Sequence, residues 1–307
     1  FIFFVGLISF YFLGKKTNVE GFFKGKMENN TEPSTLAITF SLVTTWIFSR
    51  SLLTAAILAY YFGLPGAIAY TIYYLSFITG CIFVINLRKR YRLNSVVEFF
   101  SYQFGNVGIF TYSFLIITRL ISEIFANLIV VGLVFGKEGT YDYNISIFIV
   151  MVVTLSYSYL GGFRNSIKTD VIQMIVFIIL IVFMIVSFFF IPLELNKELF
   201  VAKIYDISNP AYALILVAFL QIWSYPIHDP VMMDRGFISS IKKTKKSFFY
   251  SFFLSSILIL LFSLIGIFLS GYSLDNISFI EAISIYFGRT SSYIIFFLLI
   301  ILSLFTI

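Results

Sequence analysis

Long apolar stretches follow one another along almost the whole chain, separated by short polar segments. A helix needs about 20 apolar residues to cross the hydrocarbon core of a bilayer, and several of these stretches reach that length. A helix also satisfies its backbone hydrogen bonds within one segment, as lipid requires. The sequence therefore predicts an all-α protein that crosses a membrane several times.

The residue composition supports a membrane environment. Hydrophobic residues make up 60% of the chain and charged residues 12%, whereas about 25% of the residues in a soluble domain are charged. Membrane topology already predicts an excess of Lys and Arg in loops, so the net charge of +6 does not indicate a nucleic-acid partner. The single cysteine, Cys81, excludes an intrachain disulfide and a cysteine-based metal cluster.

The apolar stretches predict nine membrane spans, and the two at the chain ends are incomplete. Both ends lie inside apolar runs, so we expect an N- and C-terminally truncated fragment with one transmembrane domain over residues 1–307. Several spans exceed the minimum length, which predicts tilted or broken helices. The partial spans are expected at 1–13 and 292–307, and the complete ones at 34–62, 64–87, 107–135, 145–161, 169–192, 210–234 and 247–271.

The distribution of Lys and Arg predicts the orientation. If loop 14–33 is cytoplasmic, the cytoplasmic loops hold fifteen basic residues and the outer loops four. Such a bias is typical of the cytoplasmic side of a membrane protein. We therefore expect a multi-pass protein of the plasma (inner) membrane. The two remaining basic residues, Arg50 and Arg119, lie within expected spans.

Ionisable residues inside spans are the first candidates for function. A charge at the bilayer centre costs at least about 2.5–3.5 kcal/mol, so such residues usually face a protein or water cavity. Arg119, Glu123 and Asn127 are spaced by four and share one helix face. They could be a neutralised structural pair or a polar stripe along a permeation path. Asp234 and Arg235 lie near a span end, where we expect them to snorkel towards water.

The segment SYPIHDPVMMDR, residues 224–235, places two prolines four apart inside a hydrophobic span. Each proline removes a backbone donor, and interrupted helices beside polar side chains are typical of transporter binding sites. A plain proline kink is the alternative. We count Tyr225, His228 and Asp229 as candidate binding residues, although a lone histidine is more often structural than a proton relay. With one His and one Cys, a transition-metal site is improbable.

The segment TTWIFSRSLLT, residues 44–54, places Arg50 among hydroxyl side chains inside a span. Hydroxyls can cap a local break in a transmembrane helix, and the freed carbonyls could bind Na⁺, which prefers oxygen ligands. Arg50 could neutralise a substrate carboxylate, with Trp46 and Ser51 beside it. Alternatively, Arg50 pairs with Glu123 or Asp229 and never contacts substrate.

The segment LGGFRNSIKTDVIQ, residues 160–173, is expected to be a cytoplasmic loop that leads into the next span. Gly161 and Gly162 permit a tight turn. Thr169 or Asp170 could cap the helix that follows. From these residues alone, a capping role for Asp170 is favoured.

Four segments together resemble the sodium:solute symporter family, which includes bacterial proline and sodium/sugar transporters. The most specific is YSYLGGFRNSIKTDVIQ, 157–173, with its tyrosine, paired glycines, Thr-Asp and following Gln. YFGLPGAIAY, 61–70, resembles the segment after the first core helix, and LNSVVEFFSYQFG, 93–105, a loop ending in Phe-Gly. DRGFISSIKKTKKSFFYSFF, 234–253, resembles the Arg-containing loop after the sixth core helix. These segments occur in the family's order across almost the whole chain.

The resemblance implies a LeuT-type inverted-repeat fold of five plus five helices, of which this chain holds part. It also implies sodium between the broken first core helix and the eighth. Backbone oxygens near Thr44 and Ile47 would supply the first-helix side, and Asp170 would belong to the sodium exit path. The family's paired hydroxyls on the eighth helix are not in this sequence, so the resemblance implies an incomplete sodium site.

The resemblance also bears on the solute. It places Tyr225 at the inner gate that sugar-transporting members close with an aromatic side chain. Trp46, Arg50 and Ser51 depart from the family's sugar-binding pattern on the first helix. A cation at this position favours an amino acid or another carboxylate over a sugar.

The resulting expectation is a sodium-coupled symporter that imports a small organic solute by alternating access. Its partners would be the solute, Na⁺ as coupling ion and the lipid bilayer, with no organic cofactor. The alternatives are a transporter-like sensor domain and a proton-coupled carrier that uses His228 and Asp229. The chain carries no HExxH or Gly-x-Ser-x-Gly motif, so we do not expect an enzyme. The sequence leaves the solute, the stoichiometry and the oligomeric state open.

Overall fold

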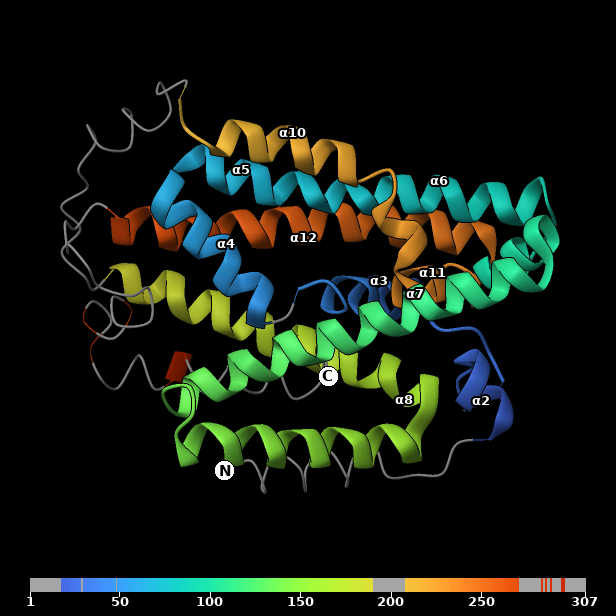
Figure 1. The fold of residues 1–307 in the computed structure, drawn as a ribbon, viewed down its shortest axis with the longest axis horizontal. Helices are drawn as coiled ribbons and strands as arrows, with labels where there is room; N and C mark the ends of the chain where they lie inside the picture. The colour runs from blue at the N-terminus through green and yellow to red at the C-terminus, as the bar shows by residue number, and fades with distance from the viewer. Residues whose placement is uncertain are drawn as a thin grey trace.

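The computed structural model describes residues 18–28, 30–47, 49–189 and 208–270, and single positions between 283 and 295. All regular structure in these residues is helical (Figure 1). The expected span 1–13 lies outside the described residues, as does 292–307 except for positions 294 and 295. Within the described part of the chain, four helices are long and apolar enough to cross a membrane, namely Leu64–Lys89, Val96–Leu133, Gly162–Ser187 and Ile241–Ser270.

The first expected complete span, 34–62, is a broken helix. Its two parts are α3 (Thr35–Thr44) and α4 (Ser49–Phe62). The Ser34 side chain caps α3 by accepting a 3.1 Å hydrogen bond from the Ala37 amide. Because the helix is interrupted within TTWIFSRSLLT, the hypothesis of a local break at this segment is confirmed.

The next two expected spans, 64–87 and 107–135, each lie within unbroken helical structure. The first consists of α5 (Leu64–Ile72), the 3₁₀ turn η1 (Tyr73–Leu75) and α6 (Ser76–Lys89). The second, α7, runs over Val96–Phe135 and turns sharply at Gly105, where φ is +61°. It begins eleven residues before the expected 107, because the residues before Gly105 are helical too.

Helix α8 (Tyr141–Phe189) contains the expected spans 145–161 and 169–192 and turns sharply at Gly162, where φ is +58°. A glycine accepts this left-handed conformation without steric cost, so one residue reverses the chain and helix resumes at once. The expected cytoplasmic loop over 160–168 is therefore wrong. Asp170 lies inside the second part of α8, and the expectation that it caps a helix is also wrong.

The expected span 210–234 is interrupted, as its two prolines predicted. It comprises α10 (Ala211–Gln221), the 3₁₀ turn η2 (Tyr225–His228) and α11 (Pro230–Arg235). The last described span, α12 (Ile241–Ser270), begins six residues before the expected 247.

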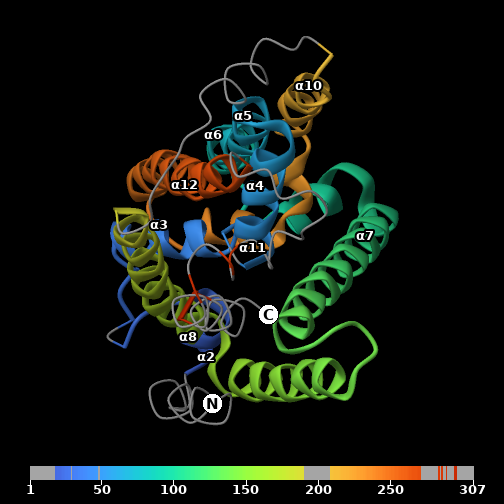
Figure 2. The ribbon, with the colours of Figure 1, turned by 90° about the vertical axis from the view of Figure 1, so that its left-hand side faces the viewer.

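Helix α12 packs against both parts of the first broken helix, α3 and α4, and against α5 and α6. Ser247 and Ser251 donate hydrogen bonds of 3.1 and 3.2 Å from α12 to the carbonyls of Thr35 and Thr39 on α3. Figure 2 shows α7 standing on the side opposite α12, with the broken helices between them. This arrangement encloses the two helix breaks.

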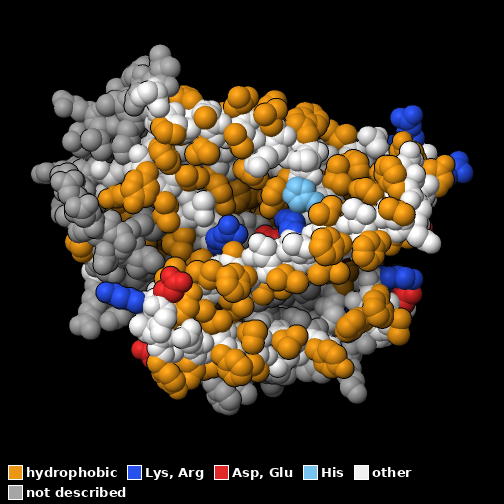
Figure 3. Space-filling model, in the orientation of Figure 1, with side chains coloured by type: hydrophobic (Ala, Val, Ile, Leu, Met, Phe, Trp, Pro, Cys, Tyr) orange, Lys and Arg blue, Asp and Glu red, His pale blue; other side chains and the backbone are white. Residues whose placement is uncertain are grey.

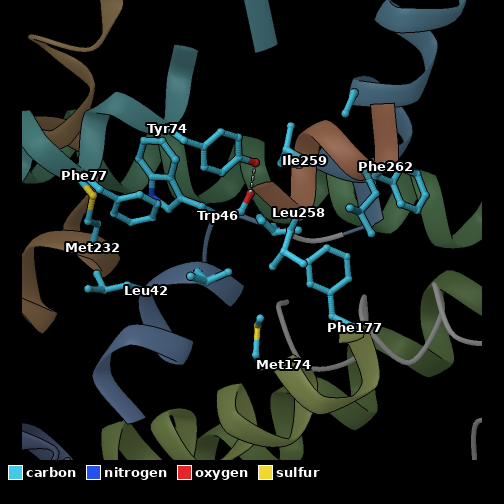
Figure 4. Packing of buried hydrophobic residues seen from close by; sticks show 14 of the residues in the cluster. Leu42, Trp46, Tyr74, Phe77, Met174, Phe177, Met232, Leu258, Ile259 and Phe262 are labelled. Atoms are coloured by element: carbon cyan, nitrogen blue, oxygen red, sulfur yellow. Dashed lines mark hydrogen bonds between the residues drawn. The ribbon is translucent and has the colours of Figure 1, made fainter. Parts of the chain in front are cut away.

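An extensive apolar core surrounds the break between α3 and α4 (Figure 4). Trp46 packs against Tyr74 and Phe77, with ring centroids 5.8 and 5.0 Å apart. Phe177 on α8 and Leu258 on α12 lie on the other side of the break. The outer face of α7, by contrast, exposes large apolar side chains such as Val107 and Phe110, as a lipid-facing surface would.

Candidate functional site

A cavity of about 320 Å³ lies where the two broken helices meet. In Figure 3, basic and acidic side chains lie together in a hollow of an otherwise largely apolar face. The volume of this cavity is near the lower end of the range for ligand pockets, roughly 300–1,000 Å³. A cavity of this size suits a small solute. The cavity is lined by Thr45, Trp46, Arg50, Ser51, Thr54, Tyr70, Tyr73, Tyr74, Glu123, Tyr225 and Asp229.

Asp229 connects the two helix breaks. Its Oδ2 accepts a 2.8 Å hydrogen bond from Trp46 Nε1 at the α3–α4 break. Its Oδ1 accepts a 3.0 Å bond from the Met232 amide and so caps α11. Asp229 is only 4% exposed. The sequence singled out Trp46 and Asp229 as separate binding residues, and the structure brings them into contact.

Arg119 on α7 links that helix to η2. Its guanidinium donates to the His228 carbonyl and to the Tyr225 hydroxyl, the latter at 3.0 Å. It also lies 3.3 Å from carboxylate oxygens of both Glu123 and Asp229. The helical pairing of Arg119 with Glu123 is therefore present, and Asp229 joins it. One guanidinium thus compensates two carboxylates at the cavity wall.

Arg50 is exposed and lines the cavity. Within the described residues no carboxylate lies within 4.0 Å of it, since Arg119 holds both Glu123 and Asp229. Arg50 thus forms no close ion pair with either acid, but its charge still acts on Glu123, so the alternative in which Arg50 neutralises one of these acids stays a prediction. In this part of the chain, the Arg50 guanidinium is left available to a molecule in the cavity.

Ser51 and the tyrosines of η1 complete the wall. Ser51 donates a 2.8 Å hydrogen bond to the Trp46 carbonyl, which also accepts one from the Tyr74 hydroxyl at 3.5 Å. Tyr70, Tyr73 and Tyr74 were not among the residues predicted for the site. Their spacing of three and four residues in YTIYY places them on one helix face, which was the signal available.

Three residues of the expected site, Arg119, Asn127 and His228, do not line the cavity. Asn127 is buried on α7, two turns beyond Arg119. His228 contributes its carbonyl to Arg119, and its ring packs on Tyr225 with centroids 4.9 Å apart. The structure therefore brings together Trp46, Arg50, Ser51, Arg119, Glu123, Tyr225 and Asp229, with Arg119 behind the cavity wall rather than lining it.

A second polar cluster lies between α3, α8 and α11. Arg235 Nη2 is 2.8 Å from Asp170 Oδ2, and Ser41 bonds to both side chains. Arg235 is 2% exposed, so the expectation that it snorkels towards water is wrong. A buried cation keeps its charge where a carboxylate and hydrogen bonds compensate it. Asp170, from the most specific of the four motifs, is thus bound to Arg235 from another.

Thr44 and Ile47, the two expected sodium-binding positions on the first core helix, lie at the break and are fully buried or nearly so. The Thr44 hydroxyl donates a 2.9 Å bond to the Phe40 carbonyl. Among the described residues no group of three or more His, Cys, Asp or Glu side chains could hold a metal ion.

The short helix α2 (Val19–Lys24) covers the turn at Gly162. Arg164 of α8 reaches over it and donates to the Lys26 and Met27 carbonyls and to Asn18 Oδ1, at 2.6 Å for the last. The Lys168 ammonium is 2.8 Å from Glu28 Oε1. The segment before the first broken helix is therefore fastened to α8.

Comparison with known proteins gives a relationship in structure but none in sequence. No family model and no curated protein matches the sequence. The fold, however, is similar to that of a Na⁺-coupled sialic acid symporter solved in a substrate-bound, outward-open state, with a TM-score of 0.68. The likeness covers 99% of this chain and 67% of the symporter at 15% sequence identity. It confirms the expected fold class, a multi-pass all-α protein with a partial LeuT-type transporter fold.

Proposed function

We propose that this chain forms the core of a sodium-coupled symporter that imports a small organic solute carrying a carboxylate. Amino acids and other carboxylates are favoured over sugars. The observation that carries this proposal is Arg50, an exposed cation in the wall of the cavity between the two helix breaks, with no carboxylate of the described residues within 4.0 Å. A guanidinium binds a carboxylate through two parallel charge-assisted hydrogen bonds.

The surroundings of the cavity support alternating access. In the orientation expected from the basic loops, α4 lies on the outer side of its break and α3 on the inner side. The cavity contacts Arg50, Ser51 and Thr54 on α4. The inner parts, α3 and α11, are joined through Asp170 and Arg235. A carrier closed inside and accessible from outside would have this arrangement.

Sodium coupling is supported by the fold, because the similar structure is that of a Na⁺-coupled symporter. We place the sodium site at the oxygens near Thr44 and Ile47 and assign Asp170 to the exit path. The plasma membrane, with the segment before α3 on the cytoplasmic side, is the location we propose.

Uptake into proteoliposomes containing the full chain tests the proposal. We expect accumulation of a radiolabelled carboxylate solute driven by an inward sodium gradient, with no competition from neutral sugars. Replacement of sodium by choline at fixed pH should abolish it. Uptake that persists without sodium, and responds to a proton gradient instead, would identify a proton-coupled carrier. Binding of the solute without any uptake would identify a sensor.

A further inference from the structure

Eight basic residues gather where α6 ends and α12 begins. These two helices pack against each other. Arg88, in the last turn of α6, donates bonds of 2.8 Å to the Gly236 carbonyl and 3.1 Å to the Thr244 hydroxyl. The basic segments of both helices are therefore held together, and Figure 3 shows basic side chains at the end of the molecule where α6 ends in Figure 1. We call Arg88, Lys89, Arg90, Arg92, Lys242, Lys243, Lys245 and Lys246 the basic cluster.

Most cations of the basic cluster have no acidic partner among the described residues. Lys243 forms an ion pair with Glu32, at 3.0 Å, and Arg88 is occupied by the two bonds within the protein. The other six are exposed, and no described carboxylate lies within 4.0 Å of them. Six uncompensated positive charges on one surface attract anions. They are Lys89, Arg90, Arg92, Lys242, Lys245 and Lys246.

The basic cluster lies at the level where the helices leave the hydrocarbon. The candidate span Leu64–Lys89 ends within it, and the candidate span Ile241–Ser270 begins within it. Phe249 and Tyr250 follow Lys246 closely, and their side chains are 52% and 47% exposed. Trp and Tyr are enriched at the interface between hydrocarbon and water, which is where Tyr250 would then lie. The cations therefore stand at the depth of the lipid headgroups.

Within α12, no acidic side chain in the first turn compensates the positive charge of its four lysines. The helix dipole places partial positive charge at this end. Lys242 and Lys246 are four residues apart, a spacing at which like charges repel on a helix. An anion outside the protein would relieve both repulsions.

We propose that the basic cluster binds the headgroup phosphates of anionic phospholipids at the membrane surface where α6 and α12 emerge. Clusters of four to eight basic residues beside transmembrane helices are typical of such sites. The site is separate from the solute cavity and does not depend on the proposed transport activity. Because α12 also packs against α3 and α4, a lipid bound here contacts the helix that supports the cavity.

Lipid retention by the purified full chain tests this site. The protein is reconstituted in nanodiscs that mix phosphatidylcholine with phosphatidylglycerol of the same acyl chains, and the retained lipids are counted by native mass spectrometry. We expect selective retention of phosphatidylglycerol, weakened by salt because the cations are exposed. The triple variant Lys242→Gln, Lys245→Gln, Lys246→Gln should lose roughly fivefold in retention for each cation removed.

Two matched variants isolate the role of charge and position. The triple Lys→Arg variant at the same positions keeps the charge and should retain phosphatidylglycerol like the wild type. Lys137→Gln removes an exposed cation from the segment between α7 and α8 and should change nothing. Retention by the triple Gln variant equal to that of the wild type would overturn the proposal.

If the triple Gln variant does not insert into the membrane, measurements on the wild-type protein still test whether the basic cluster binds anionic lipid. Equal retention of both lipids, or retention of phosphatidylglycerol that salt does not weaken, would refute the site. Soluble glycerol phosphate should not compete with the lipid at equal concentration. Its displacement of the lipid would instead identify a site for free phosphate and would also refute the proposal.

Discussion

The indole Nε1 of Trp46 donates a 2.8 Å hydrogen bond to Oδ2 of Asp229, and this bond joins the breaks of two helices. The second carboxylate oxygen, Oδ1, caps α11 through the Met232 amide. Both oxygens of one side chain therefore accept bonds, and they serve different helices. A carboxylate can fill both roles, whereas an amide has only one acceptor oxygen.

Asp229→Asn should therefore damage the site although it preserves the shape of the side chain. The amide nitrogen would face either the Trp46 N–H or the Met232 amide and leave a buried donor unpaired, at a cost of about 1–3 kcal/mol. We expect reduced thermal stability in detergent and at least about tenfold slower solute uptake. Thermal unfolding and initial uptake rates of the purified variant check this.

A double-mutant cycle with Trp46→Phe isolates the bond. Phe removes the indole donor and keeps an aromatic ring near Tyr225 and Phe77, whose centroids lie 4.9 and 5.0 Å from that of Trp46. Trp46→Phe removes one of the two donors that face Oδ2, and Arg119 remains at 3.3 Å, so Asp229→Asn should cost less in this background but still lose the contact with Arg119. Strictly additive effects on stability would mean that the two residues do not act through this bond.

The sequence predicted the breaks in the helices better than it predicted the partners of the charges. Prolines four apart in 224–235, and the hydroxyl-rich segment 44–54, are local signals because they alter the backbone where they stand. Both expected breaks are present.

The partners of the charges could not be deduced in this way, because pairing depends on packing between distant segments. Arg235 was expected at a water-exposed helix end, yet it is buried against Asp170, sixty-five residues away. Arg119 rather than Arg50 compensates Asp229. The turn at Gly162 was also expected to be a loop, because paired glycines indicate a turn without specifying how few residues it needs.

Arg50→Gln tests whether the exposed guanidinium binds substrate. Charge-assisted hydrogen bonds contribute about 1.5–3 kcal/mol, so KM for a carboxylate solute should rise about 10–150-fold. Because Arg50 has no ion pair among the described residues, thermal stability should stay within about 0.5 kcal/mol of the wild type, as for most surface substitutions. Arg50→Lys should recover part of the affinity. A KM that does not change in the folded Gln variant would exclude Arg50 from substrate binding.

Asp170→Asn separates an ionic role from a role in sodium coupling. Removing one partner of a buried ion pair costs about 3–5 kcal/mol, because Arg235 at 2% exposure would keep an uncompensated charge. Arg235→Gln should cost a similar amount through the stranded carboxylate. If Asp170 also lies on the sodium path, Asp170→Asn should raise the sodium concentration needed for half-maximal uptake. Arg235→Gln should leave that concentration unchanged. Identical sodium dependence in both variants would leave Asp170 with the ion pair alone.

The turn at Gly162 permits a prediction with a matched control on another helix. Gly162 and Gly105 adopt nearly the same left-handed conformation, at φ +58° and +61°. A Cβ on Gly162 would overlap Phe22 of α2, whereas a Cβ on Gly105 would meet nothing within 4 Å. Gly105→Ala should therefore cost only the backbone strain, about 1–3 kcal/mol. Gly162→Ala should cost more and should loosen α2 from α8.

Limited proteolysis of segment 18–28, together with thermal unfolding, measures both effects. Cleavage in α2 should accelerate in Gly162→Ala and stay at the wild-type rate in Gly105→Ala. Phe22→Ala combined with Gly162→Ala should restore part of the lost stability, because the ring is part of what the new Cβ overlaps. Equal destabilisation by the two glycine substitutions would show that the contact between Phe22 and Gly162 adds nothing beyond backbone strain.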